Sequence, residues 1–195
     1  MRAAPVLALA LLGAAAFAVG CGPSPPTPAE RLQDATAFRK EQAPDRLFAQ
    51  GKAFAALGDM TRAEQYLAAA LAGGGDDHAI VPLLIDVCVQ DGRFRSAIEY
   101  AEPYVQKHPQ ETRARYLLGT LYDGIGAFDR ARAEYESVLA SKPDAAEPHW
   151  ALGVLLRDEV KDPVLADTHF REYLRLAPSG AHADEARASL LKEVP

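Results

Sequence analysis

The sequence is poor in the residues that disulfide-rich, zinc-binding and nucleic-acid-binding proteins need. Its 195 residues include only two cysteines, Cys21 and Cys88, too few for a disulfide framework or a cysteine-rich zinc site. Basic residues are in the minority, because 21 Lys and Arg stand against 27 Asp and Glu, for a formal net charge of −6. Clustered Lys and Arg are what hold a phosphate backbone. Nucleic acid is therefore not an expected partner.

Convergent acids, bases or nucleophiles are missing from the sequence pattern, so we predict no catalytic residues, cofactor or metal site. The five histidines lie near expected turns or on expected helices at no metal-ligand spacing, and they are predicted to be solvated. The run GGGDD at 73–77 lacks the Lys-Ser/Thr of a phosphate loop and the alternating ligands of a calcium loop, and is predicted to be a connector. Cys88 is predicted to be a buried structural thiol.

The N-terminus has the form of a secretory signal peptide, with a basic start, an apolar run over 3–19 and small residues at its end. The run is about 17 residues long, whereas a membrane span needs roughly 20. The tetrad Ala18-Val19-Gly20-Cys21 resembles the lipobox of bacterial lipoproteins, although Ala18 departs from the preferred Leu. We therefore expect a lipoprotein signal peptide at 1–20.

The lipobox resemblance implies that Cys21 carries acyl chains such as palmitate and becomes the mature N-terminus. The Pro-rich stretch that follows cannot pack, so 21–27 is predicted to be the lipidated cysteine with an extended linker. Gly22 is not the Asp that retains such lipoproteins at the inner membrane. This indicates an outer-membrane lipoprotein that faces the periplasm. Ordinary signal cleavage next to a chance cysteine remains the alternative.

Alanine is the commonest residue and has the highest helix propensity, which favours an all-α protein. An internal repeat then sets the architecture. Gly58, Gly92 and Gly126 are spaced 34 residues apart, and Gly153 lies 34 after Gly119. In the last copy the spacing becomes 35, which predicts one extra residue in the turn between Asp158 and Pro163.

The third copy resembles the tetratricopeptide repeat (TPR), a helix–turn–helix unit. The matching residues are Leu118-Gly119, Tyr122, Gly126, Ala131, Tyr135 and Pro143. The resemblance implies an all-α, right-handed superhelical solenoid of about four units. The expected segments are a leading helix at 28–43, repeats at 44–77, 78–111, 112–145 and 146–180, and a capping helix at 181–195.

Small residues at Gly119 and Gly153 are expected where the two helices of a unit cross closely, and Pro109, Pro143 and Pro178 are expected to stop the second helices. The second copy departs most from the pattern, with Ile85 in place of Gly and with Pro82 in its first helix. It is predicted to be the least regular unit.

The resemblance also implies a concave groove lined by the first helix of each unit. Residues five, nine and twelve of each unit, together with one neighbouring arginine, point into such a groove. The predicted binding residues are Phe48, Lys52, Asp86, Val89, Arg113, Tyr116, Thr120, Asp123, Trp150, Val154 and Arg157. The aromatic members are typical anchors of binding interfaces. The alternative is that these rings only pack between adjacent helices.

Such a groove suits an extended peptide or a helix of a client protein, with apolar anchors giving affinity and charges giving register. We therefore expect a non-enzymatic scaffold or assembly factor that is attached to the membrane by its lipid. Two other functions remain open, an adaptor for an envelope protease or murein enzyme and an enzyme with an unrecognised site. A homodimer formed through the groove is also possible.

Overall fold

The computed structural model describes residues 27–192, and all regular structure in this range is helical. The chain divides into two compact units, Met1–Phe38 and Arg39–Pro195. Helix α1 (Pro28–Glu41) makes up most of the described part of the first unit. The predicted signal peptide and Cys21 lie outside the described residues. The prediction of an all-α fold is confirmed.

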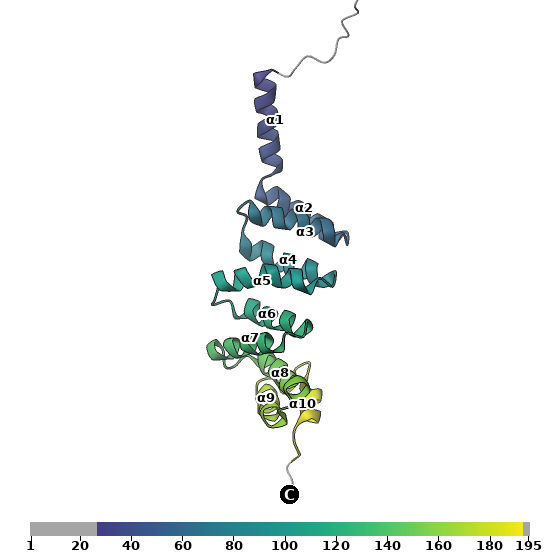
Figure 1. The fold of residues 1–195 in the computed structure, drawn as a ribbon, viewed down its shortest axis with the longest axis vertical. Helices are drawn as coiled ribbons and strands as arrows, with labels where there is room; N and C mark the ends of the chain where they lie inside the picture. The colour runs from purple at the N-terminus through teal and green to yellow at the C-terminus, as the bar shows by residue number, and fades with distance from the viewer. Residues whose placement is uncertain (1–26, 193–195) are drawn as a thin grey trace, which may run out of the picture. The chain divides into compact units, whose positions relative to one another are not determined.

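The second unit contains four pairs of helices in chain order, and consecutive helices pack on one another (Figure 1). Pair 1 is α2 (Pro44–Ala56) with α3 (Met60–Ala72), and pair 2 is α4 (Asp77–Gln90) with α5 (Phe94–Lys107). Pair 3 is α6 (Thr112–Gly124) with α7 (Phe128–Ser141). Pair 4 is α8 (Ala146–Leu155) with α9 (Pro163–Leu176).

A glycine on the first helix lets the two helices of a pair approach closely in three of these pairs. A Cβ atom at Gly51 would lie 2.6 Å from Leu67, one at Gly119 would lie 2.6 Å from Tyr135, and one at Gly153 would lie 2.5 Å from Phe170. The partner side chains are completely buried or nearly so. Because buried side chains have little freedom to move away, the crossings require glycine. The predicted role of Gly119 and Gly153 is confirmed.

Pair 2 reverses this arrangement. Ile85 takes the place of the glycine, and Ala101 takes the place of the large side chain on the second helix. Both residues are buried in the same apolar cluster. Helix α4 continues through Pro82, and its other faces contribute to a second cluster shared with pair 1. The helix is therefore apolar on most sides, as its position in the middle of the stack requires.

Cys88 lies on α4 and is completely buried, which confirms the prediction of a structural thiol. Burial raises the pKa of the thiol to about 12, and the nearby charge of Glu64 adds to the effect. A thiol with this pKa stays protonated near neutral pH and is a poor nucleophile.

The turns inside the first three pairs share one backbone feature. Gly58, Gly92 and Gly126 have φ angles of 77°, 70° and 76°, in the left-handed region that favours glycine. The second helices of pairs 2, 3 and 4 end two residues before Pro109, Pro143 and Pro178 respectively, so the predicted stops are confirmed.

Pair 4 has a different turn, and it accommodates the extra residue that the repeat spacing predicts. After α8 the chain forms a π-helical turn, Leu156–Val160, which holds one more residue than an α-helical turn. Lys161 then has a φ of 61° at the position that glycine occupies in the other pairs. The least regular unit is thus the fourth and not the second, because an inserted residue disturbs a helix more than Pro82 does.

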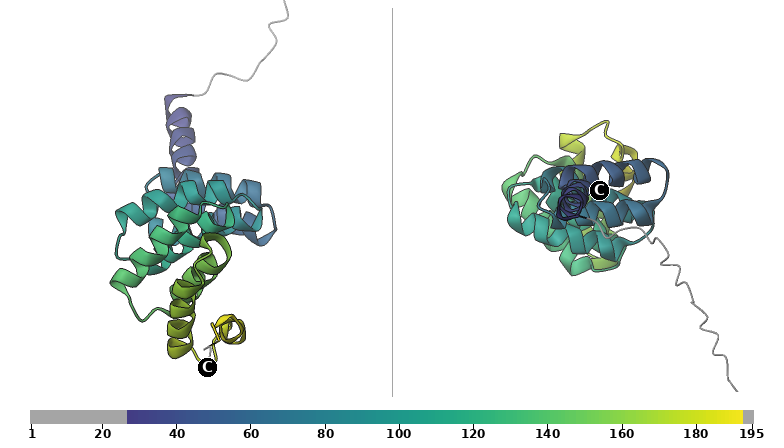
Figure 2. Two further views of the ribbon diagram at one scale, coloured as in Figure 1. Left: turned by 60° about the horizontal axis from the view of Figure 1, so that its bottom comes forward. Right: turned by 90° about the horizontal axis from the view of Figure 1, so that it is seen from above.

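Helix α10 (Ala183–Ser189) packs on α9 and buries Ala183 and Ala186 (Figure 2). It is shorter than the capping helix expected from the sequence. The backbone N–H of Leu191 donates to the Asp167 carboxylate at 2.8 Å, beyond the point where the helix ends. Within residues 27–192, we find no helix whose length and apolarity would let it cross a bilayer.

Candidate peptide-binding groove

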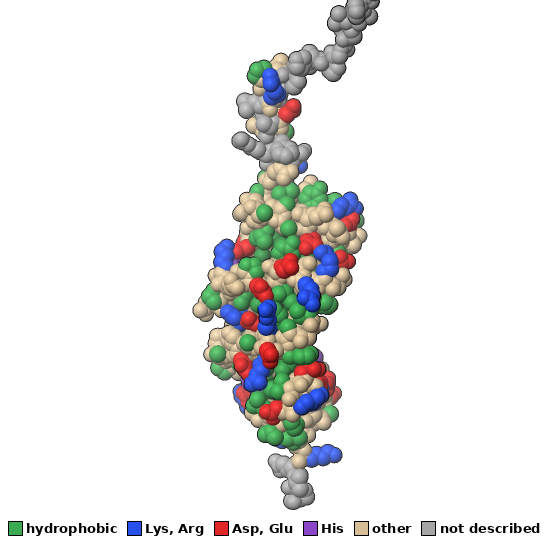
Figure 3. Space-filling model, in the orientation of Figure 1, with side chains coloured by type: hydrophobic (Ala, Val, Ile, Leu, Met, Phe, Trp, Pro, Cys, Tyr) green, Lys and Arg blue, Asp and Glu red, His purple; other side chains and the backbone are tan. Residues whose placement is uncertain are grey.

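The predicted binding residues lie on the first helices of the four pairs, with Arg157 in the π-helical turn that follows α8. Lys52, Asp86 and Arg113 are exposed, and the other eight are half-buried. Charged side chains of both signs are interspersed with apolar ones on the face that Figure 3 shows. Half-buried rings beside exposed charges are consistent with either a binding or a packing role. The contacts of each residue distinguish between these two roles.

An apolar cavity of about 500 Å³ lies between the first helices of pairs 2 and 3. It is lined by residues of α4 and α6, namely Val81, Pro82, Ile85, Arg113, Ala114, Tyr116 and Leu117. Arg113 is the one charged side chain in this lining, and it is exposed. Pro82 and Ile85, the residues that make the second copy atypical, supply much of the wall that α4 contributes.

Tyr116 connects this cavity to an acidic part of the same face. Its ring packs against Tyr135 of α7, with the ring centroids 5.6 Å apart. Burial raises the pKa of Tyr116, and the charges of Glu147 and Asp123 raise it further. Burial also raises the pKa of Asp123, with a contribution from Glu159. The groove therefore has an arginine at one margin of the cavity and carboxylates beyond Tyr116.

Trp150 is largely occupied by contacts inside the chain. Its ring stacks on His182, with centroids 4.5 Å apart and planes 2° apart. It also contacts the rings of Phe170 and Tyr173 at 5.5 and 5.8 Å. These contacts favour the packing alternative for Trp150, since its ring already serves as a bridge between α8, α9 and the C-terminal segment.

Arg157 is likewise engaged with neighbouring residues. Its guanidinium donates to both oxygens of Asp158 at 2.7 and 2.8 Å, and to Ser189 of α10 at 2.6 Å. The hydrogen bonds to Asp158 are the main cause that raises the pKa of Arg157. The side chain therefore fastens α10 to the π-helical turn.

The other predicted residues make local contacts. The Lys52 ammonium lies 4.9 Å from the centroid of the Phe48 ring, within reach of a cation–π interaction. Asp86 accepts a hydrogen bond from Gln90 at 2.7 Å, and Thr120 donates to the carbonyl of Leu117 at 2.7 Å. Val89 and Val154 pack on the main apolar cluster. Of the eleven predicted residues, only Arg113 and Tyr116 line the apolar cavity between α4 and α6.

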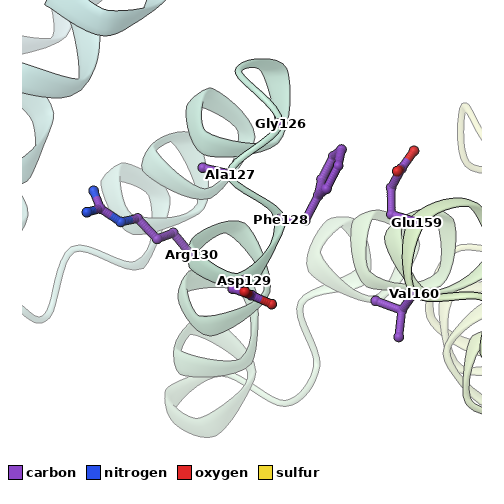
Figure 4. A pocket seen from close by; sticks show the side chains of 7 residues that line it. All are labelled: Gly126, Ala127, Phe128, Asp129, Arg130, Glu159 and Val160. Carbon is purple, nitrogen blue, oxygen red and sulfur yellow. The ribbon is translucent and has the colours of Figure 1, made fainter.

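A second, shallower cavity of about 560 Å³ contains none of the eleven predicted binding residues. It lies between the segment Gly126–Arg130, which includes the start of α7, and the residues Glu159 and Val160 of the π-helical turn. Figure 4 shows the Phe128 ring beside the space, Glu159 and Val160 across from it, and Arg130 directed away. The inserted residue in pair 4 was a signal that this turn would be unusual.

The histidines differ from the prediction that they are solvated. His108 and His169 are half-buried. The Nδ1 atoms of His149 and His169 lie 3.0 Å apart, and His108 Nε2 donates a hydrogen bond to Asp77 at 3.0 Å. Sequence spacing missed these pairs because the partners come from different helices.

Comparison with known proteins agrees with this helix-pair architecture. The family model described as tetratricopeptide repeat matches residues 88–153, which run from the end of α4 to α8. The chain has a tetratricopeptide-repeat fold. Proteins built from these repeats are typically non-enzymatic scaffolds for protein interactions. No curated protein matches the chain in sequence.

Several solved TPR structures are similar to this one. YrrB, described as a TPR protein with an unusual peptide-binding site, is 19% identical with a TM-score of 0.66, over 82% of this chain and 85% of that chain. MamA from Desulfovibrio magneticus RS-1, from residue 41 to its end, is 25% identical with a TM-score of 0.63, over 77% and 85%. A TPR protein from Parabacteroides merdae ATCC 43184 is 20% identical with a TM-score of 0.67, over 76% and 59%.

Proposed function

We propose that this TPR protein is a non-enzymatic scaffold that binds a peptide or helix of a client protein at the cavity between α4 and α6. The observation that carries the proposal is the composition of this cavity. Its lining is apolar apart from one exposed arginine, Arg113, and it lies on the first helices of neighbouring repeats. Peptide binding by YrrB, a protein of the same fold, supports the assignment.

The size of the cavity suits one or two large apolar side chains, because ligand pockets commonly measure about 300–1,000 Å³. Burying one such side chain contributes about 1.5–3 kcal/mol. The Arg113 guanidinium can pair with a carboxylate that follows the anchor in the client, and a planar guanidinium binds a carboxylate through two parallel hydrogen bonds. The apolar anchor then gives affinity, and Arg113 gives direction and register.

Asp123, beyond Tyr116, gives the client a second electrostatic constraint. The groove has a positive charge at Arg113 and a negative charge at Asp123. A client would match both if it placed an acidic residue near Arg113 and a basic residue near Asp123. The reverse orientation would place like charges together, which costs free energy and selects against wrong partners. We therefore expect clients with an apolar anchor between an acidic and a basic residue.

The proposal includes attachment to the membrane through lipid at Cys21, with the repeats on the periplasmic face of the outer membrane of a bacterium. The supporting observations are the apolar run at 3–19, the tetrad that ends at Cys21 and the Pro-rich linker. Attachment would hold the groove near membrane-bound clients and raise its effective concentration there. Incorporation of labelled palmitate that Cys21→Ser abolishes is the expected result, and incorporation that persists in this variant would refute the anchor.

The groove is tested by filling the cavity. Ala114 is in the cavity lining, whereas Ala133 is exposed on α7, so Ala114→Phe and Ala133→Phe add the same ring at two places. We expect affinity capture from the native envelope to recover a client with the wild-type protein and with Ala133→Phe. Ala114→Phe should lose it, and Arg113→Glu should weaken it by at least about tenfold because a favourable charge becomes unfavourable.

Thermal unfolding of each variant provides the folding control for this experiment. If Ala114→Phe melts like the wild type and still recovers every client, then the cavity is not the binding site. Catalytic activity in the purified wild-type protein that Ala114→Phe leaves unchanged would contradict the scaffold proposal itself.

A further inference from the structure

The start of α4 and the connection between α5 and α6 bring together a group of histidine and carboxylate side chains, none of which is a predicted binding residue. Asp77 and His78 are the first residues of α4, His108 follows the last residue of α5, and Glu111 precedes α6. Asp77, His78 and His108 each offer a ligand atom, and these three atoms lie within 4.8 Å of one another.

The distances among these groups are short. His108 Nε2 lies 3.0 Å from Asp77 Oδ2, and His78 Nδ1 lies 2.8 Å from Glu111 Oε1. The two imidazole rings are adjacent, with centroids 4.3 Å apart. Each imidazole therefore has a carboxylate beside it and the other imidazole next to it, and Asp77, His78 and His108 place three nitrogen or oxygen donors around one small volume.

This donor set matches the ligands of zinc. Zn²⁺ binds imidazole nitrogen and carboxylate oxygen at about 2.0–2.2 Å in tetrahedral geometry, so its ligand atoms lie about 3.3 Å apart. The ligand atoms of Asp77, His78 and His108 lie within 4.8 Å of one another, and the distance from His108 Nε2 to Asp77 Oδ2, 3.0 Å, is close to that value. Small side-chain rotations would bring the three ligand atoms to that spacing, and the His78 side chain, which is 54% exposed, has room to turn.

Tyr104 supplies the outer contact that zinc ligands commonly have. Its hydroxyl donates to Glu111 Oε2 at 2.8 Å and lies 3.0 Å from His78 Nδ1. Hydrogen bonds of this kind orient the ligands around a metal. Burial raises the pKa of Tyr104 to about 12, and its hydrogen bond to Glu111 adds to the effect, so the hydroxyl remains a donor.

Lys107 opposes metal binding and has to move. Its ammonium lies 2.6 Å from Asp77 Oδ2, the oxygen that also contacts His108. Lys107 is 67% exposed, so it can swing into solvent at small cost. The hydrogen bonds from His108 and Lys107 lower the pKa of Asp77 well below its usual range, so the carboxylate is already ionised and available as a ligand.

We propose that Asp77, His78 and His108 bind one Zn²⁺ ion, and that Glu111, whose carboxylate lies beside His78 Nδ1, orients that imidazole. The ion would join the start of α4 to the connection between α5 and α6, and so would fasten the start of pair 2 to the segment that leads into pair 3. Magnesium should not replace zinc, because Mg²⁺ prefers oxygen ligands in octahedral geometry.

The test is calorimetric titration of ZnCl₂ into the full chain, held in a mild detergent at pH 7.5. His78→Gln removes an exposed ligand, and His149→Gln removes a histidine from the other histidine pair as the matched control. We expect one site per chain, weakened about 100-fold by His78→Gln and unchanged by His149→Gln. Equal affinity in the wild type and His78→Gln would overturn the proposal, and so would a loss of binding caused by His149→Gln.

A second variant provides a result in the opposite direction. Lys107→Gln removes the competing ammonium, so zinc should bind about fivefold more tightly. Zinc should also raise the melting temperature of the wild type, and MgCl₂ at the same concentration should not. Zinc binding that Lys107→Gln leaves unchanged or weakens would show that the ion does not bind at Asp77.

Discussion

The third and fourth helix pairs share their central crossing and differ around it. In both, a glycine on the first helix meets an aromatic ring on the second, Gly119 against Tyr135 and Gly153 against Phe170. Beside this crossing, pair 3 has an ion pair, with Arg115 Nη1 2.9 Å from Glu134. Pair 4 has His149 and His169 at the corresponding positions, with their Nδ1 atoms 3.0 Å apart.

The comparison separates what fixes the fold from what can vary. The crossing is determined by the space between two backbones, so both pairs need glycine there. The two side chains beside each crossing are only partly buried. At these positions the sequence can hold either an ion pair, as in pair 3, or two imidazoles, as in pair 4. The turns vary as well, since Gly126 in pair 3 corresponds to Lys161 after a π-helical turn in pair 4. Interior contacts are thus shared, and peripheral contacts give each repeat its own properties.

The largest expected effect comes from filling the shared crossing. In Gly119→Ala the new Cβ would lie 2.6 Å from the buried Tyr135 ring, and we expect a loss of about 2 kcal/mol in the free energy of unfolding. Gly124→Ala makes the same change on the same helix, where the nearest atom is 4.0 Å away, and should stabilise by about 0.5 kcal/mol. Urea denaturation measures both, and equal effects would contradict the close crossing.

A smaller effect should appear on acidification in pair 4 and not in pair 3, which contains no histidine. Burial and the neighbouring His149 lower the pKa of His169. The unfolded chain therefore takes up protons first as the pH falls through about 6.5, and stability, complete above that pH, decreases below it. Between pH 8 and 5.5 we expect a loss of about 1 kcal/mol, because a difference of one pKa unit between the folded and unfolded states corresponds to about 1.4 kcal/mol.

Replacing the two histidines of pair 4 with the arginine and glutamate of pair 3 tests this assignment. The double variant His149→Arg, His169→Glu should unfold with nearly the same free energy at pH 8 and at pH 5.5, because its ion pair does not titrate in that range. Urea denaturation at the two pH values gives the result. A pH response that persists unchanged in the double variant would place its origin outside pair 4.

The smallest expected effect concerns the two turns. Lys161 has a left-handed φ of 61°, which costs a side chain free energy that glycine avoids. Lys161→Gly should therefore stabilise the protein by about 0.5 kcal/mol, whereas Gly126→Ala, at a φ of 76°, should destabilise it by a similar amount. Opposite shifts in the melting temperature are the expected result, and shifts of the same sign would mean that the turns are not equivalent.

The repeat spacing was sufficient to predict the helices, the crossings at Gly119 and Gly153 and the extra residue before Pro163. These features depend on backbone geometry, which a 34-residue period records directly. The cavity was predicted less completely. Tyr116 and Arg113 could be placed on the groove by counting positions, but the contributions of Pro82 and Ile85 to its wall depend on how two neighbouring repeats pack.

Contacts between residues far apart in the sequence could not be predicted in this way. Asp77 and His108 are 31 residues apart, and they meet because two turns lie at the same edge of the stack. Trp150 was expected to face a client, and its ring instead stacks on His182, because the C-terminal segment returns to cover it. Such contacts follow from the tertiary structure and leave no periodic signal in the sequence.

Because Cys88 is completely buried, its reaction with a thiol reagent reports local opening of the repeat stack around α4. If Cys21 carries lipid, then Cys88 is the single free thiol of the mature chain. A thiol reagent can reach it only when α4 separates from the helices on either side of it. The rate of labelling would therefore measure how often the middle of the repeat stack opens. The measurement could be made in the native protein at the membrane, without an added probe.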